Sequence, residues 1–284
     1  MTTTATAAAA ACDRLVRRIA EPAPMVCGIV NVTADSFFDG GRFDSTARAV
    51  EHGCALAAEG AEILDVGGES TRPGARPPAL AEELARVIPV VEALAAHTSV
   101  PISVDTSRAE VMREAVAAGA VMINDVRALR LRGALEAAAA LAVPVCLMHM
   151  QGIPPTMQDS PAYHDVTAEV SGFLVTRAAA CQASGVPREH IVLDPGFGFG
   201  KTLQHNLALL ASLERIAGLG YPVMAGLSRK GMLGAITGRA VTDRLAGSVA
   251  AALIAAQHGA RILRVHDVAA TVDAITVARA VEMV

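Results

Sequence analysis

Eight short apolar runs, each ending in a polar or charged residue, constrain the fold of this chain more than any other feature. The polar end residues are Asn31, Glu69, Asp105, Asn124, His149, Asp194, Ser228 and His266. Apolar runs that alternate with Ala-rich helical stretches are typical of parallel strands covered by helices. Eight such units favour an α/β fold, a single-domain (β/α)8 TIM barrel, with its active site at the carboxyl ends of the strands. We therefore expect the eight polar residues to surround one pocket.

The strand and helix segments alternate along the whole chain. The predicted strands cover residues 25–32, 62–70, 101–107, 121–126, 144–150, 191–198, 222–230 and 261–268. The predicted helices cover residues 46–59, 79–96, 108–118, 133–141, 162–184, 203–217, 243–257 and 269–281. Glycines follow several of these helices, where a left-handed residue ends a helix well. No linker divides the chain, so we predict one barrel domain over residues 21–284, preceded by a flexible tail over residues 1–20.

Composition excludes several classes of function. The net charge of −4 is not accompanied by a basic stripe or an aromatic platform, so we expect no nucleic-acid partner. The apolar runs are too interrupted to cross a membrane, and the Ala-rich start lacks the basic region of a signal peptide. The five cysteines are scattered without a C-x-x-C pair. Together these features predict a cytoplasmic protein.

Three polar residues at equivalent strand ends suggest a site for a flat, nitrogen-rich heterocycle. Asp105 and Asp194 are acceptors, and Asn124 offers both a donor and an acceptor. The edge of an aminopyrimidinone requires such a mixture. Each residue also has a purely structural interpretation, because Asp105 could cap a helix, Asn124 could bond a turn and Asp194 could start a loop.

A second group of residues suggests an anion site. Arg264 and His266 lie two residues apart, so their side chains point to the same side, and Lys230 adds a third donor. Asn31 offers an amide oxygen suited to Mg²⁺. Alternatively, Arg264 could form an interior ion pair with Asp267 or Asp273, and Lys230 could be a solvated loop charge.

The motifs of the chain resemble those of the dihydropteroate synthase family. The matching runs are GIVNVTADSFFDGG (28–41), DVGGESTRPGA (65–75), SVDTS (103–107), MINDVRAL (122–129), MHMQGIPPTMQ (148–158), DPGFGFGKT (194–202), GLSRK (226–230) and RVHDV (264–268). The resemblance implies a transferase of folate biosynthesis that condenses 7,8-dihydropterin-6-ylmethyl diphosphate with 4-aminobenzoate. It also implies Mg²⁺ as cofactor, a homodimer, and competition by sulfonamides for the aminobenzoate site.

The resemblance also implies roles for individual residues. The residues expected to bind substrate are Thr71, Arg72, Asp105, Asn124, Asp194, Ser228, Arg229, Lys230, Arg264 and His266. Those expected to take part in catalysis are Asp105, Asp194, Lys230, Arg264 and His266. Asn31 is the expected magnesium ligand, and the loops expected to close over the site contain Asp35, Ser36, Phe37 and Pro73.

Two other functions remain open. A methyltetrahydrofolate-binding methyltransferase domain shares the barrel and the pterin contacts, but it has no need of a group that binds diphosphate. A non-catalytic pterin-binding paralogue is the other. It is suggested by Ala34, where the family usually has proline, and by Gly231, where the family often has serine.

Overall fold

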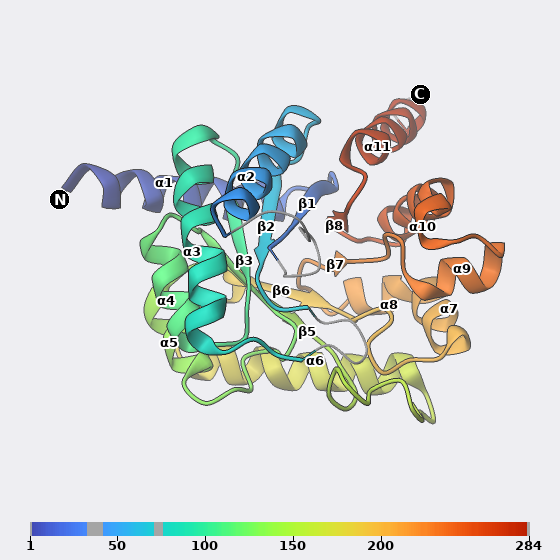
Figure 1. The fold of residues 1–284 in the computed structure, drawn as a ribbon. Helices are drawn as coiled ribbons and strands as arrows, with labels where there is room; N and C mark the ends of the chain where they lie inside the picture. Colours follow the sequence, from blue (N-terminus) through green and yellow to red (C-terminus); the bar gives the residue numbers. More distant parts are fainter. Residues whose placement is uncertain (1, 33–41, 71–75, 283–284) are drawn as a thin grey trace.

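Eight parallel strands form a nearly closed barrel with helices around it, which confirms the predicted fold (Figure 1). The computed structural model describes residues 2–32, 42–70 and 76–282. The strands are hydrogen-bonded in the order β6-β5-β4-β3-β2-β1-β8-β7. An isolated parallel bridge then joins Leu193 of β6 to Val223, the residue before β7. Closure places the carboxyl ends of all eight strands around one mouth.

The strands lie close to the predicted runs. They are β1 (Met25–Asn31), β2 (Ile63–Gly67), β3 (Ile102–Asp105), β4 (Met122–Asp125), β5 (Val145–Met148), β6 (Ile191–Asp194), β7 (Met224–Ala225) and β8 (Ile262–Val265). The α-helices are α1 (Thr2–Ala20), α2 (Arg42–Ala58), α3 (Leu80–His97), α4 (Ala109–Ala117), α5 (Ala134–Leu141), α6 (Val166–Ala183), α7 (Leu203–Ala211), α8 (Leu213–Ala217), α9 (Gly231–Thr237), α10 (Leu245–Gln257) and α11 (Val268–Glu282). The described residues also contain the 3₁₀ turns η2 (Arg188–His190) and η3 (Val241–Asp243).

Two helical segments differ from the prediction. The single helix expected over 203–217 divides into α7 and α8 at Ser212, whose hydroxyl donates to the carbonyl oxygen of Ala208 at 2.6 Å. Helix α9 was not predicted, because it is short and contains Gly231 and Gly234.

The prediction of a flexible tail over residues 1–20 is wrong for residues 12–20, because this part of α1 contributes to the core. Leu15 and Ile19 lie four residues apart, and their exposed fractions are only 1% and 2%. Arg18 donates through Nε to Glu62 at 2.7 Å, just before β2 begins. Helix α1 therefore packs at the amino-terminal end of the strands, opposite the mouth.

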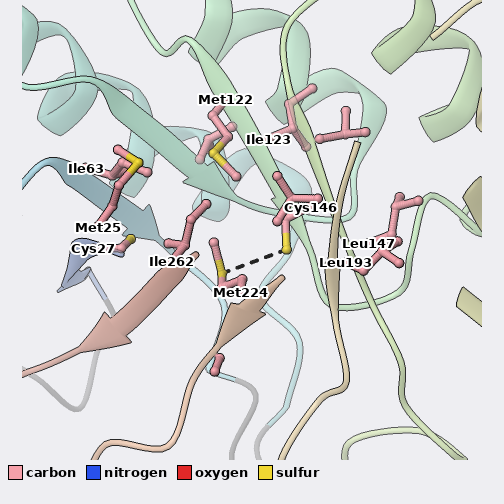
Figure 2. Close-up of a cluster of buried hydrophobic side chains, with 14 of the residues drawn as sticks. Met25, Cys27, Ile63, Met122, Ile123, Cys146, Leu147, Leu193, Met224 and Ile262 are labelled. Atoms are coloured by element: carbon pink, nitrogen blue, oxygen red, sulfur yellow. Dashed lines mark hydrogen bonds between the residues drawn. The ribbon is translucent and has the colours of Figure 1, made fainter. Parts of the chain in front are cut away.

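The barrel interior is built from aliphatic and sulfur-containing side chains, as the absence of Trp predicts. Figure 2 shows Met25, Ile63, Met122 and Ile262 among the strands. Cys146 Sγ lies 3.8 Å from Met224 Sδ in the same cluster. These apolar side chains form a layer beneath the polar residues nearer the carboxyl ends, which we call the apolar floor, and water is excluded from it. Across the described ranges, no helix is long and apolar enough to cross a membrane.

Candidate active site

Four strands bring the predicted site residues to one mouth. Asp105, Asn124 and Asp194 lie at or next to the carboxyl ends of β3, β4 and β6. The parallel register places Asp105 directly beside Asn124. Arg264 on β8 reaches across the barrel, because its Nη2 donates to Asp105 Oδ2 at 2.8 Å. The predicted convergence therefore holds for these four residues.

Arg264 is the cation of a buried ion-pair network. Its Nε donates to Asp65 Oδ2 at 2.6 Å, and its Nη2 donates to Asp105. Burial lowers the pKa of Arg264, but attraction by Asp65 and Asp105 outweighs burial, so the net shift is upward. Burial raises the pKa of Asp105 to about 8, although Arg264 opposes the shift. An interior ion pair thus exists, but its carboxylates are not Asp267 or Asp273.

Asn124 and Asp105 are not the local capping or turn residues that their positions allow. The Nδ2 of Asn124 donates to Asp65 Oδ2 at 3.0 Å, on a neighbouring part of the barrel. Helix α4 has Arg108 as its N-cap residue and no side-chain cap. Both side chains are therefore turned toward the barrel interior rather than committed to local structure.

Asp194 has a structural contact as well as a position at the mouth. One carboxylate oxygen, Oδ1, accepts from the backbone N–H of Gly196 at 2.7 Å. Burial raises the pKa of Asp194, and the nearby ammonium of Lys230 opposes the shift. The structural interpretation of Asp194 therefore holds, because one oxygen orders the loop, and its role toward a heterocycle stays a prediction.

Lys230 lies against the loop that follows β6. Its ammonium donates to the carbonyl oxygen of Phe197 and lies 4.8 Å from the centre of the Phe199 ring. Burial lowers the pKa of Lys230 to about 8, while Asp194 partly offsets the effect. Lys230 is therefore not a solvated loop charge. Next to it, a Cβ on Gly231 would meet no atom within 4 Å, so crowding does not explain the glycine.

Ser228, Arg229 and His266 lie together at the ends of β7 and β8. His266 Nδ1 is 3.0 Å from Ser228 Oγ, which also accepts from the His266 backbone N–H. Arg229 pairs with Asp267, with 2.5 Å between Nη2 and Oδ1, and its side chain is 41% exposed. The acid considered as a partner for Arg264 is thus bound to Arg229.

His149 does not join the mouth, so the prediction that all eight polar end residues surround the pocket is wrong. Its ring packs edge-on against Phe173 of α6 at 4.9 Å between centroids. Its Nδ1 lies 2.9 Å from Lys201 Nζ, which also donates to the carbonyl oxygens of Gly196 and Phe199. Burial, and then Lys201, lower the pKa of His149 to about 3. This neutral histidine supports the loop from outside the mouth.

Several predicted residues lie outside the described ranges. They are Asp35, Ser36, Phe37, Thr71, Arg72 and Pro73, together with Ala34. Glu69, just before residues 71–75, forms an ion pair with Arg127 at 2.7 Å. The roles expected of Asp35, Ser36, Phe37, Thr71, Arg72 and Pro73 stay predictions.

Two interior residues were missed by sequence reasoning. Asp65 is fully buried within β2, and Lys201 is only 3% exposed. Burial lowers the pKa of Lys201 to about 7. A charged residue inside an otherwise apolar strand was the available signal for Asp65. For Lys201, the signal was the stretch GFGFGK (196–201), in which glycines alternate with phenylalanines before the lysine.

The structure offers one candidate for the predicted metal ligand. Asn31 ends β1, and no hydrogen bond to its side chain comes from residues 2–32, 42–70 or 76–282. Over those ranges, no group of three or more His, Cys, Asp or Glu side chains could hold a metal ion. A lone amide oxygen fits Mg²⁺ only if water and substrate phosphate supply the other ligands.

Known proteins share both the sequence and this architecture. The model of the pterin binding enzyme family matches residues 27–266. Dihydropteroate synthase of Escherichia coli (strain K12) is 53% identical over 257 residues, which are 90% of this chain and 91% of that protein. The chain belongs to the dihydropteroate synthase family.

Solved structures of this family have the same barrel. Xanthomonas albilineans dihydropteroate synthase with 4-aminobenzoic acid superposes with a TM-score of 0.88 at 59% identity, covering 92% of this chain and 94% of that chain. The same enzyme in complex with 7,8-dihydropteroate gives a TM-score of 0.85 at 56% identity, covering 92% and 95%.

Proposed function

We propose that this chain condenses 7,8-dihydropterin-6-ylmethyl diphosphate with 4-aminobenzoate, releasing 7,8-dihydropteroate and diphosphate in folate biosynthesis. The observation that carries this proposal is a group of polar side chains at the carboxyl ends of β3, β4 and β6, half-buried at Asp105 and buried at Asn124 and Asp194. It occurs in a chain of the dihydropteroate synthase family. Membership favours this reaction over that of a methyltransferase domain.

The pterin ring would lie in the mouth above the apolar floor. Asp105, Asn124 and Asp194 would accept or donate along its nitrogen-rich edge. Lys230 would donate to a ring acceptor and lie against the ring face. Because these groups are held by strands and by the ordered loop after β6, little reorganisation is needed on binding.

The diphosphate would lie toward β8 and the loops. His266 and Arg264 supply donors there, and Arg264 Nη1 donates no hydrogen bond to the described residues. Thr71 and Arg72 would add donors from residues 71–75. We propose Asn31 as the protein ligand for Mg²⁺, which when bound would neutralise diphosphate charge.

The protein need not supply a nucleophile. The bond between the pterin methylene carbon and diphosphate breaks, and diphosphate keeps the electron pair. The carboxylates of Asp105 and Asp194 would stabilise the resulting cation, which is delocalised into the ring. The amine of aminobenzoate, held near Ser228 and Arg229, then forms the new carbon–nitrogen bond and loses a proton to solvent. Loops containing Asp35, Ser36, Phe37 and Pro73 would exclude water during this step.

Release of diphosphate tests the activity. With pterin diphosphate and Mg²⁺ supplied, we expect release that requires 4-aminobenzoate, falls with a chelator, and is lost in Asp105→Asn. Circular dichroism would verify that the variant folds. Pterin binding without aminobenzoate-dependent release would contradict the proposal and identify a non-catalytic paralogue. A pterin turnover that required cobalamin would instead indicate a methyltransferase domain.

We also propose a cytoplasmic homodimer. All five cysteines are free thiols, as expected in a reducing compartment. Large apolar side chains are exposed on the last two helices, with Ile254 at 41%, Val277 at 65% and Val281 at 71%. Light scattering should give a dimer mass that falls to the monomer mass in Val277→Lys with Val281→Lys. The same change at Val175, a 44% exposed position on α6, should leave the mass unchanged.

A further inference from the structure

The amide of Asn124 can adopt only one useful orientation in this barrel. Its neighbour is the carboxylate of Asp65, 3.0 Å away, and an ionised carboxylate only accepts hydrogen bonds. The NH₂ group must therefore face Asp65. The amide oxygen is then left for another partner, and Asn124 is only 4% exposed.

Asp65 also fixes the adjacent cation. The same oxygen, Oδ2, accepts from Arg264 Nε at 2.6 Å. Asp65 is fully buried, so these hydrogen bonds are not in competition with solvent. A single carboxylate oxygen thus sets both the direction of the Asn124 amide and the position of the Arg264 guanidinium. Asp65 itself lies two residues before the end of β2, deeper than the mouth.

We propose that Asp65 is a positioning residue that makes Asn124 a hydrogen-bond acceptor toward the substrate, and so determines which heterocycles the site accepts. This inference rests on the proposed function. With Asp194 and the ionised form of Asp105, the mouth presents three acceptors. It therefore selects a ring edge rich in N–H donors, as in a 7,8-dihydropterin with its 2-amino group and N8–H. Were Asn124 free to turn, it could donate as well, and rings with acceptors at these places would also fit.

Two variants separate positioning from packing. Asp65→Leu removes the acceptor, so Asn124 becomes free to turn. In Asp65→Asn, the amide oxygen should take the place of Oδ2, because Asn124 and Arg264 both donate there. This conservative variant therefore retains the orientation of Asn124.

The readout is equilibrium binding of three ligands without turnover: the dihydropterin, its 2-oxo analogue and its oxidised form, which lacks N8–H. In the unchanged protein, we expect at least one analogue to bind on the order of tenfold more weakly than the dihydropterin. The ratio of the dissociation constant of that analogue to that of the dihydropterin should persist in Asp65→Asn and approach one in Asp65→Leu. The affinity for 4-aminobenzoate should change little in either variant.

If Asp65→Leu weakened the binding of all three ligands by the same factor, the inference would be overturned, because loss of packing alone would have that effect. If that variant does not fold, the rate of hydrogen exchange of the Asn124 side-chain amide in the unchanged protein shows whether the amide is fixed. Slow exchange without ligand supports the fixed amide, and fast exchange overturns it. Failure of the unchanged protein to bind dihydropterin would overturn both proposals. Aminobenzoate-dependent turnover together with an unaltered ratio in Asp65→Leu would overturn this one alone.

Discussion

Replacing Arg264 with methionine should destabilise the protein by about 3 kcal/mol. The change keeps most of the side-chain length but removes the donors to Asp65 and Asp105, at 2.6 and 2.8 Å. Breaking a buried ion pair by removing one partner costs roughly 3–5 kcal/mol. We take the lower end because the side chain of Arg264 is 21% exposed and that of Asp105 is 14% exposed, so solvent screens part of the attraction.

The loss of stability in Arg264→Met should also depend on pH. Burial already raises the pKa of Asp105 from 3.8 to about 8, and Arg264 is the main group that opposes this rise. Without Arg264 the pKa rises further, so above the ordinary value the folded variant binds more protons than the unfolded chain. The free energy of unfolding should therefore fall in both proteins as pH rises from about 4 to 8, and above about 8 it should go on falling only in the variant.

Urea unfolding at about pH 6 and about pH 9.5, on the two sides of the pKa of Asp105, measures both effects. The matched control is Arg229→Met, because the pair of Arg229 with Asp267 is exposed and should contribute about 0–1 kcal/mol. A loss in Arg264→Met no larger than that of the control, and equal at the two pH values, would refute the reasoning.

Three further predictions follow from burial and backbone geometry. Because burial lowers the pKa of Lys230 to about 8, its charge is present below that pH, and kcat/KM for the pterin substrate should fall as pH rises through about 8. Lys230→Arg should move this fall to higher pH, and an unmoved profile would contradict the assignment. Leu15→Ala should cost about 2–5 kcal/mol in urea unfolding, since Leu15 is only 1% exposed, whereas a loosely attached α1 would give almost no change. Gly196→Ala should weaken both stability and pterin binding, because a Cβ there would lie 1.9 Å from the carbonyl oxygen of His149. Gly185→Ala, also at a positive φ but with open space, should cost only the left-handed strain of about 1–2 kcal/mol and spare pterin binding.

The local pattern was sufficient to predict the barrel and much of its mouth. Buried parallel strands need continuous apolar runs, and the chain emerges at the same edge each time, so the position of Asp105, Asn124 and Asp194 follows from the pattern. The family resemblance rests on these same runs. The position of α1 was not predicted, because the Ala-rich composition of the start was interpreted as a tail, although Leu15 and Ile19 lie on one helical face.

What only the tertiary structure decided is how the polar residues are paired. Asp65 contacts Asn124 and Arg264, which are 59 and 199 residues away, and no local spacing indicates either contact. His149 shows the same limit, since it ends a predicted strand like the others but packs outward against Phe173. Burial and ion pairing depend on which strands become neighbours when the barrel closes. The sequence by itself therefore determined where polar groups emerge, and closure of the barrel decided which of them bind one another.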